Sequence, residues 1–208
     1  MTASEHIALP QVLCKLAHST STCNLFSIIS VLALGPMLQT LTTNFSSDAS
    51  LMKLALQQAR DASQRSEVPV GAIIVHNDQI VGRGSNRREE LQSPIAHAEI
   101  IALDEASRKL GYWRLTECDL YVTLEPCIMC AGAILQGRLR RLIFGCLDPK
   151  AGAVISLFNL CDDRRLNHRL TVTGGVLAEE CANVLSEFFT LVRQQKRSTR
   201  CGEVAEPG

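Results

Sequence analysis

The sequence has no excess of charge of either sign, because 21 lysine and arginine residues are balanced by 21 aspartate and glutamate residues. Such a chain lacks a long-range positive field, which excludes global electrostatic attraction of nucleic acid. Any phosphate contact would have to come from local basic clusters. Three clusters are present, and each serves equally well as a solubilising surface: Arg138, Arg140 and Arg141; Arg164, Arg165 and Arg169; and Arg193, Lys196, Arg197 and Arg200.

The nine cysteines lack the even number and the regular spacing of a disulfide framework. Most cysteines outside the motif described below lie among apolar residues, where a thiol serves as a small hydrophobic side chain. This usage favours a reducing compartment, so we expect a cytoplasmic protein. The cysteines interpreted in this way are Cys118, Cys146, Cys161 and Cys181.

The first 50 residues contain an apolar segment, residues 24–41, that has no charged side chain. Its length of roughly 18 residues is the lower limit for a membrane span. The pair Gly35-Pro36 interrupts it, and only Lys15 supplies a fixed positive charge before it, which argues against an anchor or a signal peptide. Three interpretations stay open: a membrane or targeting element, an appended helix, or an upstream stretch without function. We expect no membrane partner for the remainder of the chain.

Two motifs indicate a metal site. A His-x-Glu motif contributes His97 and Glu99, and a Pro-Cys-x-x-Cys motif contributes Cys127 and Cys130. One imidazole and two thiolates suit zinc, and a site with three protein ligands leaves a position for water, whereas structural zinc sites use four. Glu99 is not needed as a ligand, and a carboxylate beside the metal can act as general base and then as general acid. This combination is the signature of the zinc nucleobase deaminases, so we predict hydrolytic deamination with zinc hydroxide as the nucleophile.

Plainer explanations exist for the same residues. The Cys-x-x-Cys motif is also found in redox pairs and in structural zinc sites, and His97 fits a hydrogen-bonded core histidine. A redox pair would leave the His-x-Glu motif unexplained, however, and a structural site lacks a fourth ligand of matching spacing.

Strands and helices are expected to alternate, which predicts an α/β sheet covered on both faces. Pro126 fits the first position of the helix that carries the two motif cysteines. The expected helices are residues 51–66, 97–110, 126–136 and 178–195, with a short helical piece after residue 152. The expected strands are residues 70–75, 79–84, 120–124, 141–146 and 171–176.

Further segments resemble the bacterial tRNA-specific adenosine deaminases, a family of the cytidine and deoxycytidylate deaminase superfamily. The match is collinear from about Leu51 to about Lys196 and includes residues 67–75, 82–87, 97–100, 121–133, 144–145, 148–153, 166–168 and 185–189. The resemblance implies a three-layer α/β/α sandwich with a five-stranded mixed central sheet, as in cytidine deaminase. It also divides the chain into an N-terminal extension (1–50), a zinc-dependent deaminase domain (51–196) and a flexible C-terminal tail (197–208).

The resemblance implies that the protein converts adenosine to inosine at the wobble position (34) of a tRNA anticodon. By position match, one Zn²⁺ per subunit would be bound by His97, Cys127 and Cys130, and Glu99 would transfer protons. The partners implied are the anticodon loop of tRNA and a second copy of the chain in a homodimer.

Three more residues are assigned by position match to substrate binding. Asn86 matches an asparagine that hydrogen-bonds the flipped base, and an amide suits this role because it offers a donor and an acceptor together. Asp148 and Lys150 match a loop that reaches the RNA. All three also fit ordinary turn chemistry. Leu147 departs from the family, whose members often carry a basic residue at this position.

Two rival functions use the same metal core. One is a deaminase of free bases or nucleotides, of the guanine, cytosine or deoxycytidylate type. The other is a non-catalytic zinc-binding partner subunit, against which the presence of Glu99 argues, since a structural site has no use for that carboxylate.

Overall fold

The structure is a computed structural model that describes residues 47–202 and, among these, the side chains of residues 47–198. All of these residues belong to one compact unit, Thr43–Gly208. The apolar segment 24–41 and residues 203–208 of the expected tail lie outside the described residues. Within the described part, no helix has both the length and the apolar character needed to cross a membrane.

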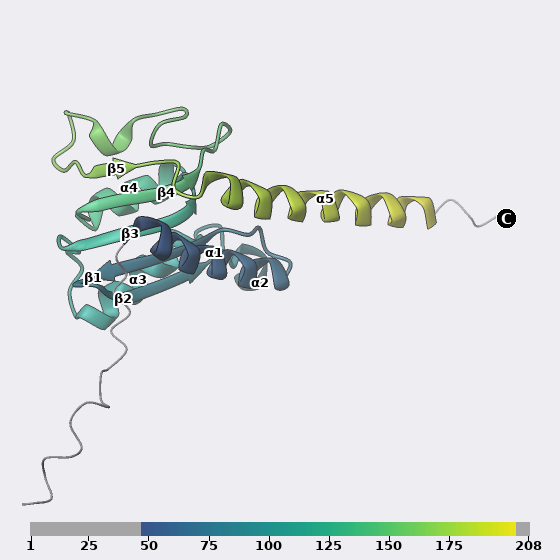
Figure 1. The fold of residues 1–208 in the computed structure, drawn as a ribbon, viewed down its shortest axis with the longest axis horizontal. Coiled ribbons are helices and arrows are strands. Elements are labelled where there is room, and N and C mark those ends of the chain that lie inside the picture. The colour runs from purple at the N-terminus through teal and green to yellow at the C-terminus, as the bar shows by residue number, and fades with distance from the viewer. Residues whose placement is uncertain (1–46, 203–208) are drawn as a thin grey trace, which may run out of the picture. The chain divides into compact units, whose positions relative to one another are not determined.

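The described residues form a mixed five-stranded sheet with helices between the strands (Figure 1). The strand order is β2-β1-β3-β4-β5, in which β1 is antiparallel to β2 and β3, whereas β3, β4 and β5 are parallel. This confirms the predicted fold class. In chain order the elements are α1 (Asp48–Gln64), β1 (Gly71–His76), β2 (Gln79–Ser85), α2 (Arg88–Leu91), α3 (Ala98–Leu110), β3 (Cys118–Leu124), α4 (Ile128–Gln136), β4 (Arg141–Cys146), a 3₁₀ turn (Leu160–Asp162), β5 (Thr171–Thr173) and α5 (Ala178–Gly202).

Helices cover both faces of the sheet and complete the three layers (Figure 1). Because successive strand side chains point to opposite faces, Ile74 packs with Ala102 of α3 and Ile134 of α4. Its neighbour Ile73 faces the other side, in a cluster that includes Leu56 of α1. These two apolar clusters hold the sheet rigidly between the helices, which fixes the ends of the strands where loops carry functional side chains.

Several element boundaries differ from the prediction. The helix α4 begins at Ile128 with Cys127 as its N-cap, so placing Pro126 in the first helical position was wrong. The strand β5 ends at Thr173 because two glycines follow, and the second, Gly175, has a φ of +87°. The expected helical piece after residue 152 consists of turns, followed by the 3₁₀ turn.

The last helix, α5, is longer than expected and continues to Gly202, past the end of the predicted domain at residue 196. In Figure 1 it extends away from the sheet. Its first turns contact β3, β4 and α1. The side chains of residues 193–198, in its later turns, are exposed.

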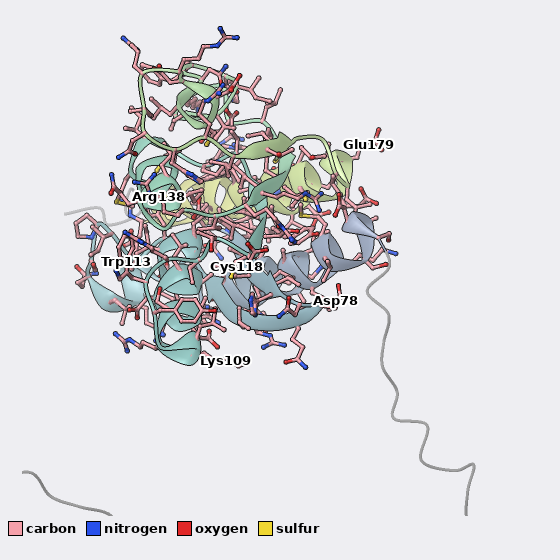
Figure 2. The ribbon with its side chains drawn as sticks, turned by 90° about the vertical axis from the view of Figure 1, so that its left-hand side faces the viewer. Asp78, Lys109, Trp113, Cys118, Arg138 and Glu179 are labelled. Atoms are coloured by element: carbon pink, nitrogen blue, oxygen red, sulfur yellow. The ribbon has the colours of Figure 1, made fainter. Side chains whose placement is uncertain are left out.

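The turn of the β1–β2 hairpin lies between the two strands expected at residues 70–75 and 79–84, and it consists of Asn77 and Asp78. Asn77 and Asp78 both have positive φ angles, of 48° and 59°, as the tight turn of a two-residue hairpin requires. Figure 2 faces this end of the sheet, where Asp78, Lys109 near the end of α3 and Cys118 at the start of β3 lie. The candidate metal ligands lie at the opposite end, where β3 finishes and α3 and α4 begin.

Candidate metal centre and substrate cavity

Two helix N-termini carry the residues of the predicted metal site. His97 is the N-cap of α3 and Cys127 is the N-cap of α4, and both have extended backbone conformations. Glu99 and Cys130 lie in the first turns of the same two helices. The positive end of a helix dipole stabilises anions, so this placement favours thiolates and a carboxylate at the site.

The three predicted ligands come together. The ligand atoms of His97, Cys127 and Cys130 all lie within 4.8 Å of one another. The Nδ1 atom of His97 is 3.8 Å from the sulfur of Cys127 and 3.5 Å from that of Cys130. Around a tetrahedral zinc ion, a nitrogen and a sulfur ligand lie about 3.5–3.6 Å apart. The donor set and its spacing therefore fit a metal ion, with three protein ligands supplied by the described residues.

The protonation of the cluster also suits metal binding. Hydrogen bonds from Cys130 and His97 lower the pKa of Cys127 to about 3, which makes this sulfur a thiolate at neutral pH. The same contacts raise the pKa of His97 and of Cys130, since both partners then donate to the thiolate. A metal ion would replace the protons that the three groups share here.

Glu99 is buried beside this cluster, with 4% of its surface exposed. Its Oε2 atom has no hydrogen-bond partner among the described residues. Burial raises the pKa of its carboxyl group above the ordinary value. Buried polar atoms without partners are rare in proteins and usually mark a group that meets a ligand or water. Glu99 therefore presents a carboxylate oxygen that is available to a ligand beside the three candidate metal ligands.

A cavity of about 230 Å³ opens onto the cluster. It is smaller than the pockets of about 300–1,000 Å³ that hold drug-sized ligands, and it suits a single small ring system. Its walls combine apolar and polar groups. They include His97, Glu99 and Cys127 with Val68, Val70, Asn86, Arg88 and Asp148.

The three further predicted residues differ in their placement. Asn86 and Asp148 line the cavity, whereas Lys150 does not and is exposed on the loop that follows β4. The Asp148 side chain accepts hydrogen bonds from the backbone N–H groups of Lys150 and Ala151, at 2.9 and 3.2 Å. This is the turn chemistry that the sequence also suggested for Asp148.

Sequence reasoning did not single out Glu125, which organises the loop that carries Asp148. Although Glu125 is only 2% exposed, its carboxylate accepts hydrogen bonds from the backbone N–H groups of four loop residues and from a hydroxyl group. Burial alone would raise the pKa of Glu125, but these hydrogen bonds lower it below the ordinary value. The donors are the N–H groups of Asp148, Val154, Ile155 and Ser156, and the Ser156 hydroxyl.

Gly152 lies where the same loop comes close to the candidate metal ligands. A Cβ atom at this position would lie 2.3 Å from the Glu125 carboxylate, so only glycine fits. Gly152 also forms an isolated β-bridge with Cys127. An acidic residue directly before Pro126-Cys127, together with a glycine in the later loop, is the sequence signal that could have identified this contact.

The mixed five-stranded sheet, with a His-Cys-Cys cluster and a buried glutamate at two helix N-termini, defines the nucleobase deaminase class. A family model described as MafB19-like deaminase matches residues 46–193. The tRNA-specific adenosine deaminase of Bacillus subtilis (strain 168) is 47% identical over 153 residues, which cover 74% of this chain and 95% of the relative. The chain belongs to the family of tRNA-specific adenosine deaminases.

A second curated relative and one solved structure agree with this assignment. The tRNA-specific adenosine deaminase of Haemophilus influenzae is 48% identical over 151 residues, covering 72% of this chain and 87% of the relative. A structure solved in a study of A-to-I editing by tRNA:A34 deaminases at the wobble position has a TM-score of 0.63 and 46% identity, covering 64% of this chain and 97% of the other. A guanine deaminase from Nitrosomonas europaea is more distant, with a TM-score of 0.57 and 26% identity over 68% of this chain and 84% of its own.

Proposed function

We propose that this protein is a hydrolase that converts adenosine 34 of tRNA into inosine. The observation that carries the proposal is the buried oxygen of Glu99, which no donor in the described part of the chain meets, beside three converging candidate metal ligands. A structural metal site would have no use for such a group, because its desolvation is costly unless a ligand meets it. Membership of the family supports the choice of tRNA as substrate.

We propose Zn²⁺ as the metal, held by His97, Cys127 and Cys130, one ion per subunit. When bound at such a site, zinc lowers the pKa of water so that hydroxide is available near neutral pH. His97 and Cys127 line the cavity together with Glu99, so an ion held by these ligands would lie at the cavity wall that Glu99 shares. Three protein donors leave a position for solvent, which distinguishes a catalytic from a structural site.

Glu99 would carry the protons. Its carboxylate would accept one proton from the attacking water and deliver it to the ring nitrogen next to the amine-bearing carbon. It would then take the proton of the newly added hydroxyl group and deliver it to the departing amine. The C–N bond breaks, ammonia leaves and a carbonyl remains, so adenosine and water give inosine and ammonia. The direction of the pKa shift of Glu99, which burial raises above the ordinary value, agrees with this double role, because a more basic carboxylate accepts a proton more readily.

The substrate would enter as an unstacked base. Proteins read RNA bases that are turned out of loops, and a cavity of about 230 Å³ admits one base but no paired duplex. We propose that Asn86 hydrogen-bonds this base in the cavity and that Asp148 and Lys150 contact the surrounding anticodon loop. Lys150 is exposed outside the cavity, where a cation meets phosphate rather than the base.

We also propose that the protein forms a homodimer. Several large apolar side chains are exposed at the start of α4 and on the loop after Gly152, and large exposed apolar patches mark protein–protein contacts. These side chains belong to Ile128, Ile155, Leu157 and Phe158, which are 55%, 57%, 51% and 47% exposed. Replacing Leu157 with aspartate should convert the dimer into a monomer, measured by sedimentation.

An assay with parallel substrates tests the reaction. The zinc-loaded full chain is incubated with a transcribed arginine tRNA that has an ACG anticodon, and separately with free adenosine, guanine and cytidine. We expect inosine in the tRNA and no turnover of the free compounds. Activity confined to free guanine would contradict the proposal and would place the protein with its more distant structural relative.

A further inference from the structure

Glu67, in the loop between α1 and β1, is fully buried and lies behind the cavity wall. Both of its carboxylate oxygens are used. One accepts a hydrogen bond from the backbone N–H of Glu90 at 2.7 Å, and the other accepts one from the side-chain amide of Asn86 at 3.0 Å. A buried carboxylate is costly unless its hydrogen bonds compensate for the lost water. Position 67 therefore requires a side chain that can accept two hydrogen bonds.

Asn86 is held on two sides. Its backbone N–H donates to the carbonyl of Val70 at 3.0 Å, and its side chain donates to Glu67. An amide has an N–H₂ end and an oxygen end of nearly equal size, and only its hydrogen bonds decide which end points where. Because a carboxylate can only accept, Glu67 forces the N–H₂ end of Asn86 toward itself. The amide oxygen and the second N–H then remain for a ligand in the cavity that Asn86 lines.

We propose that Glu67 is a positioning residue that fixes the polarity of the Asn86 amide and thereby determines which nucleobase the cavity accepts. This inference rests on the proposed function, in which Asn86 binds the base. The base presents its own fixed pattern of donors and acceptors, and an amide turned by 180° would oppose donor to donor and acceptor to acceptor. Glu67 thus acts through Asn86 and does not itself line the cavity.

Substituting Glu67→Gln isolates this effect, because glutamine keeps the shape but supplies only one acceptor. The backbone N–H of Glu90 cannot turn, so the glutamine oxygen stays with it and the N–H₂ group faces Asn86. Asn86 then relieves the conflict by turning its oxygen toward residue 67. We expect kcat/KM on the tRNA transcript to fall by about 10- to 100-fold, since a buried donor or acceptor facing a like group is strongly disfavoured.

A double-mutant cycle separates positioning from mere stability. Wild type, Glu67→Gln, Asn86→Ala and the double variant are compared for kcat, KM and zinc content. Each is also tested for binding to an anticodon stem–loop that carries purine riboside, which has no amine to lose, at the target position. We expect Glu67→Gln to weaken binding in the wild-type background, and to change it by less than about twofold once Asn86 is alanine.

Two further variants distinguish a change in the orientation of Asn86 from a general loss of stability caused by Glu67→Gln. Combining Glu67→Gln with Asn86→Asp restores a hydrogen bond between the two positions, so the melting temperature should recover while binding and turnover should not. Asp119→Asn is the matched control. It removes another buried carboxylate, which pairs with Arg140 and Arg141 at the far end of the sheet, and it should lower stability without changing KM.

Two outcomes would overturn the positioning role. One is an equal effect of Glu67→Gln with and without Asn86, and the other is recovery of turnover together with stability when Glu67→Gln is combined with Asn86→Asp. If Asn86→Ala bound the stem–loop as tightly as wild type, the proposed role of Asn86 would fail, and the inference about Glu67 with it. The tRNA assay on the wild-type protein reports separately on the reaction itself.

Discussion

At the level of single residues, the site contains groups whose surroundings shift their pKa away from the ordinary value. Glu99 is a buried carboxylate with one oxygen that meets no hydrogen-bond donor within residues 47–202, and Cys127 is a thiol held as a thiolate. The buried oxygen of Glu99 costs free energy in the folded protein, whereas hydrogen bonds in the fold stabilise the Cys127 thiolate. Shifted pKa values of this kind concentrate where a protein binds a ligand or performs chemistry.

Substituting Glu99→Gln should separate metal binding from catalysis. Glutamine keeps the size and leaves the three metal donors untouched, but it cannot carry a proton. We expect turnover to fall by about 10²- to 10⁴-fold, the usual contribution of a positioned acid–base group. Zinc content, measured by atomic emission, should stay at the wild-type level. Undiminished turnover would refute the role of Glu99.

At the scale of helices, strands and loops, the loop after β4 is held in its conformation by the hydrogen bonds that the buried Glu125 carboxylate accepts from it. The sequence predicted the strands and helices on either side, because their apolar periodicity is clear. The sequence did not predict the conformation of this loop. That conformation depends on hydrogen bonds between Glu125 and residues more than twenty positions later in the chain. The expectation that α4 begins at Pro126 was wrong for a similar reason, because Cys127 is the N-cap of the helix and lies in the His-Cys-Cys cluster.

Substituting Glu125→Gln should loosen this loop. The new amide N–H₂ would face backbone N–H groups that now donate to a carboxylate, and each such conflict costs about 1–3 kcal/mol. We expect a lower free energy of unfolding in urea, and a higher KM for tRNA because Asp148 is displaced. A variant with unchanged stability and KM would show that the loop holds its shape without Glu125.

The start of α1 is tied to the sheet by a partly buried set of polar contacts. The Tyr121 hydroxyl donates to Asp48 at 2.8 Å, and Arg141 pairs with the same carboxylate at 2.9 Å. Burial and the bond to Asp48 raise the pKa of Tyr121 above its usual value near 10. Since the folded state holds this proton more tightly than the unfolded chain, the contribution to stability is complete below about pH 10 and is lost at higher pH.

Stability should therefore fall as the pH rises above about 10, and Tyr121→Phe should reduce that fall. Urea unfolding at pH 9 and pH 11 measures the difference between the two proteins. An equal loss in both would assign the alkaline sensitivity to other groups.

Over the molecule as a whole, the net charge is zero but the charges are unevenly distributed. Two of the basic clusters noted in the sequence are largely neutralised, since Arg140 and Arg141 pair with Asp119, and Arg165 pairs with Asp163. Lys196 and Arg197 lie exposed near the end of α5, where no ion pair with another described residue holds them. The sequence located these clusters but not their partners, because ion pairs between distant segments leave no local pattern.

The exposed end of α5 should carry part of the affinity for RNA. Replacing Lys196 and Arg197 with glutamine should weaken binding of the tRNA transcript and flatten its dependence on salt, by about 0.7–0.9 in the logarithmic slope for each phosphate that is no longer neutralised. Affinity measured between about 50 and 200 mM salt gives this slope. The matched change at Arg165, whose charge is already paired, should leave the slope unchanged.

Coordination of the metal itself offers the sharpest test of the proposed site. X-ray absorption at the zinc edge of the purified, zinc-loaded chain should show two sulfur ligands at about 2.3 Å, one imidazole at about 2.0–2.1 Å and one oxygen from solvent. Substituting Cys130→Ala should remove one sulfur from that shell. A shell of four protein ligands, or bound zinc whose sulfur count does not change in the variant, would contradict the assignment of an open catalytic site to His97, Cys127 and Cys130.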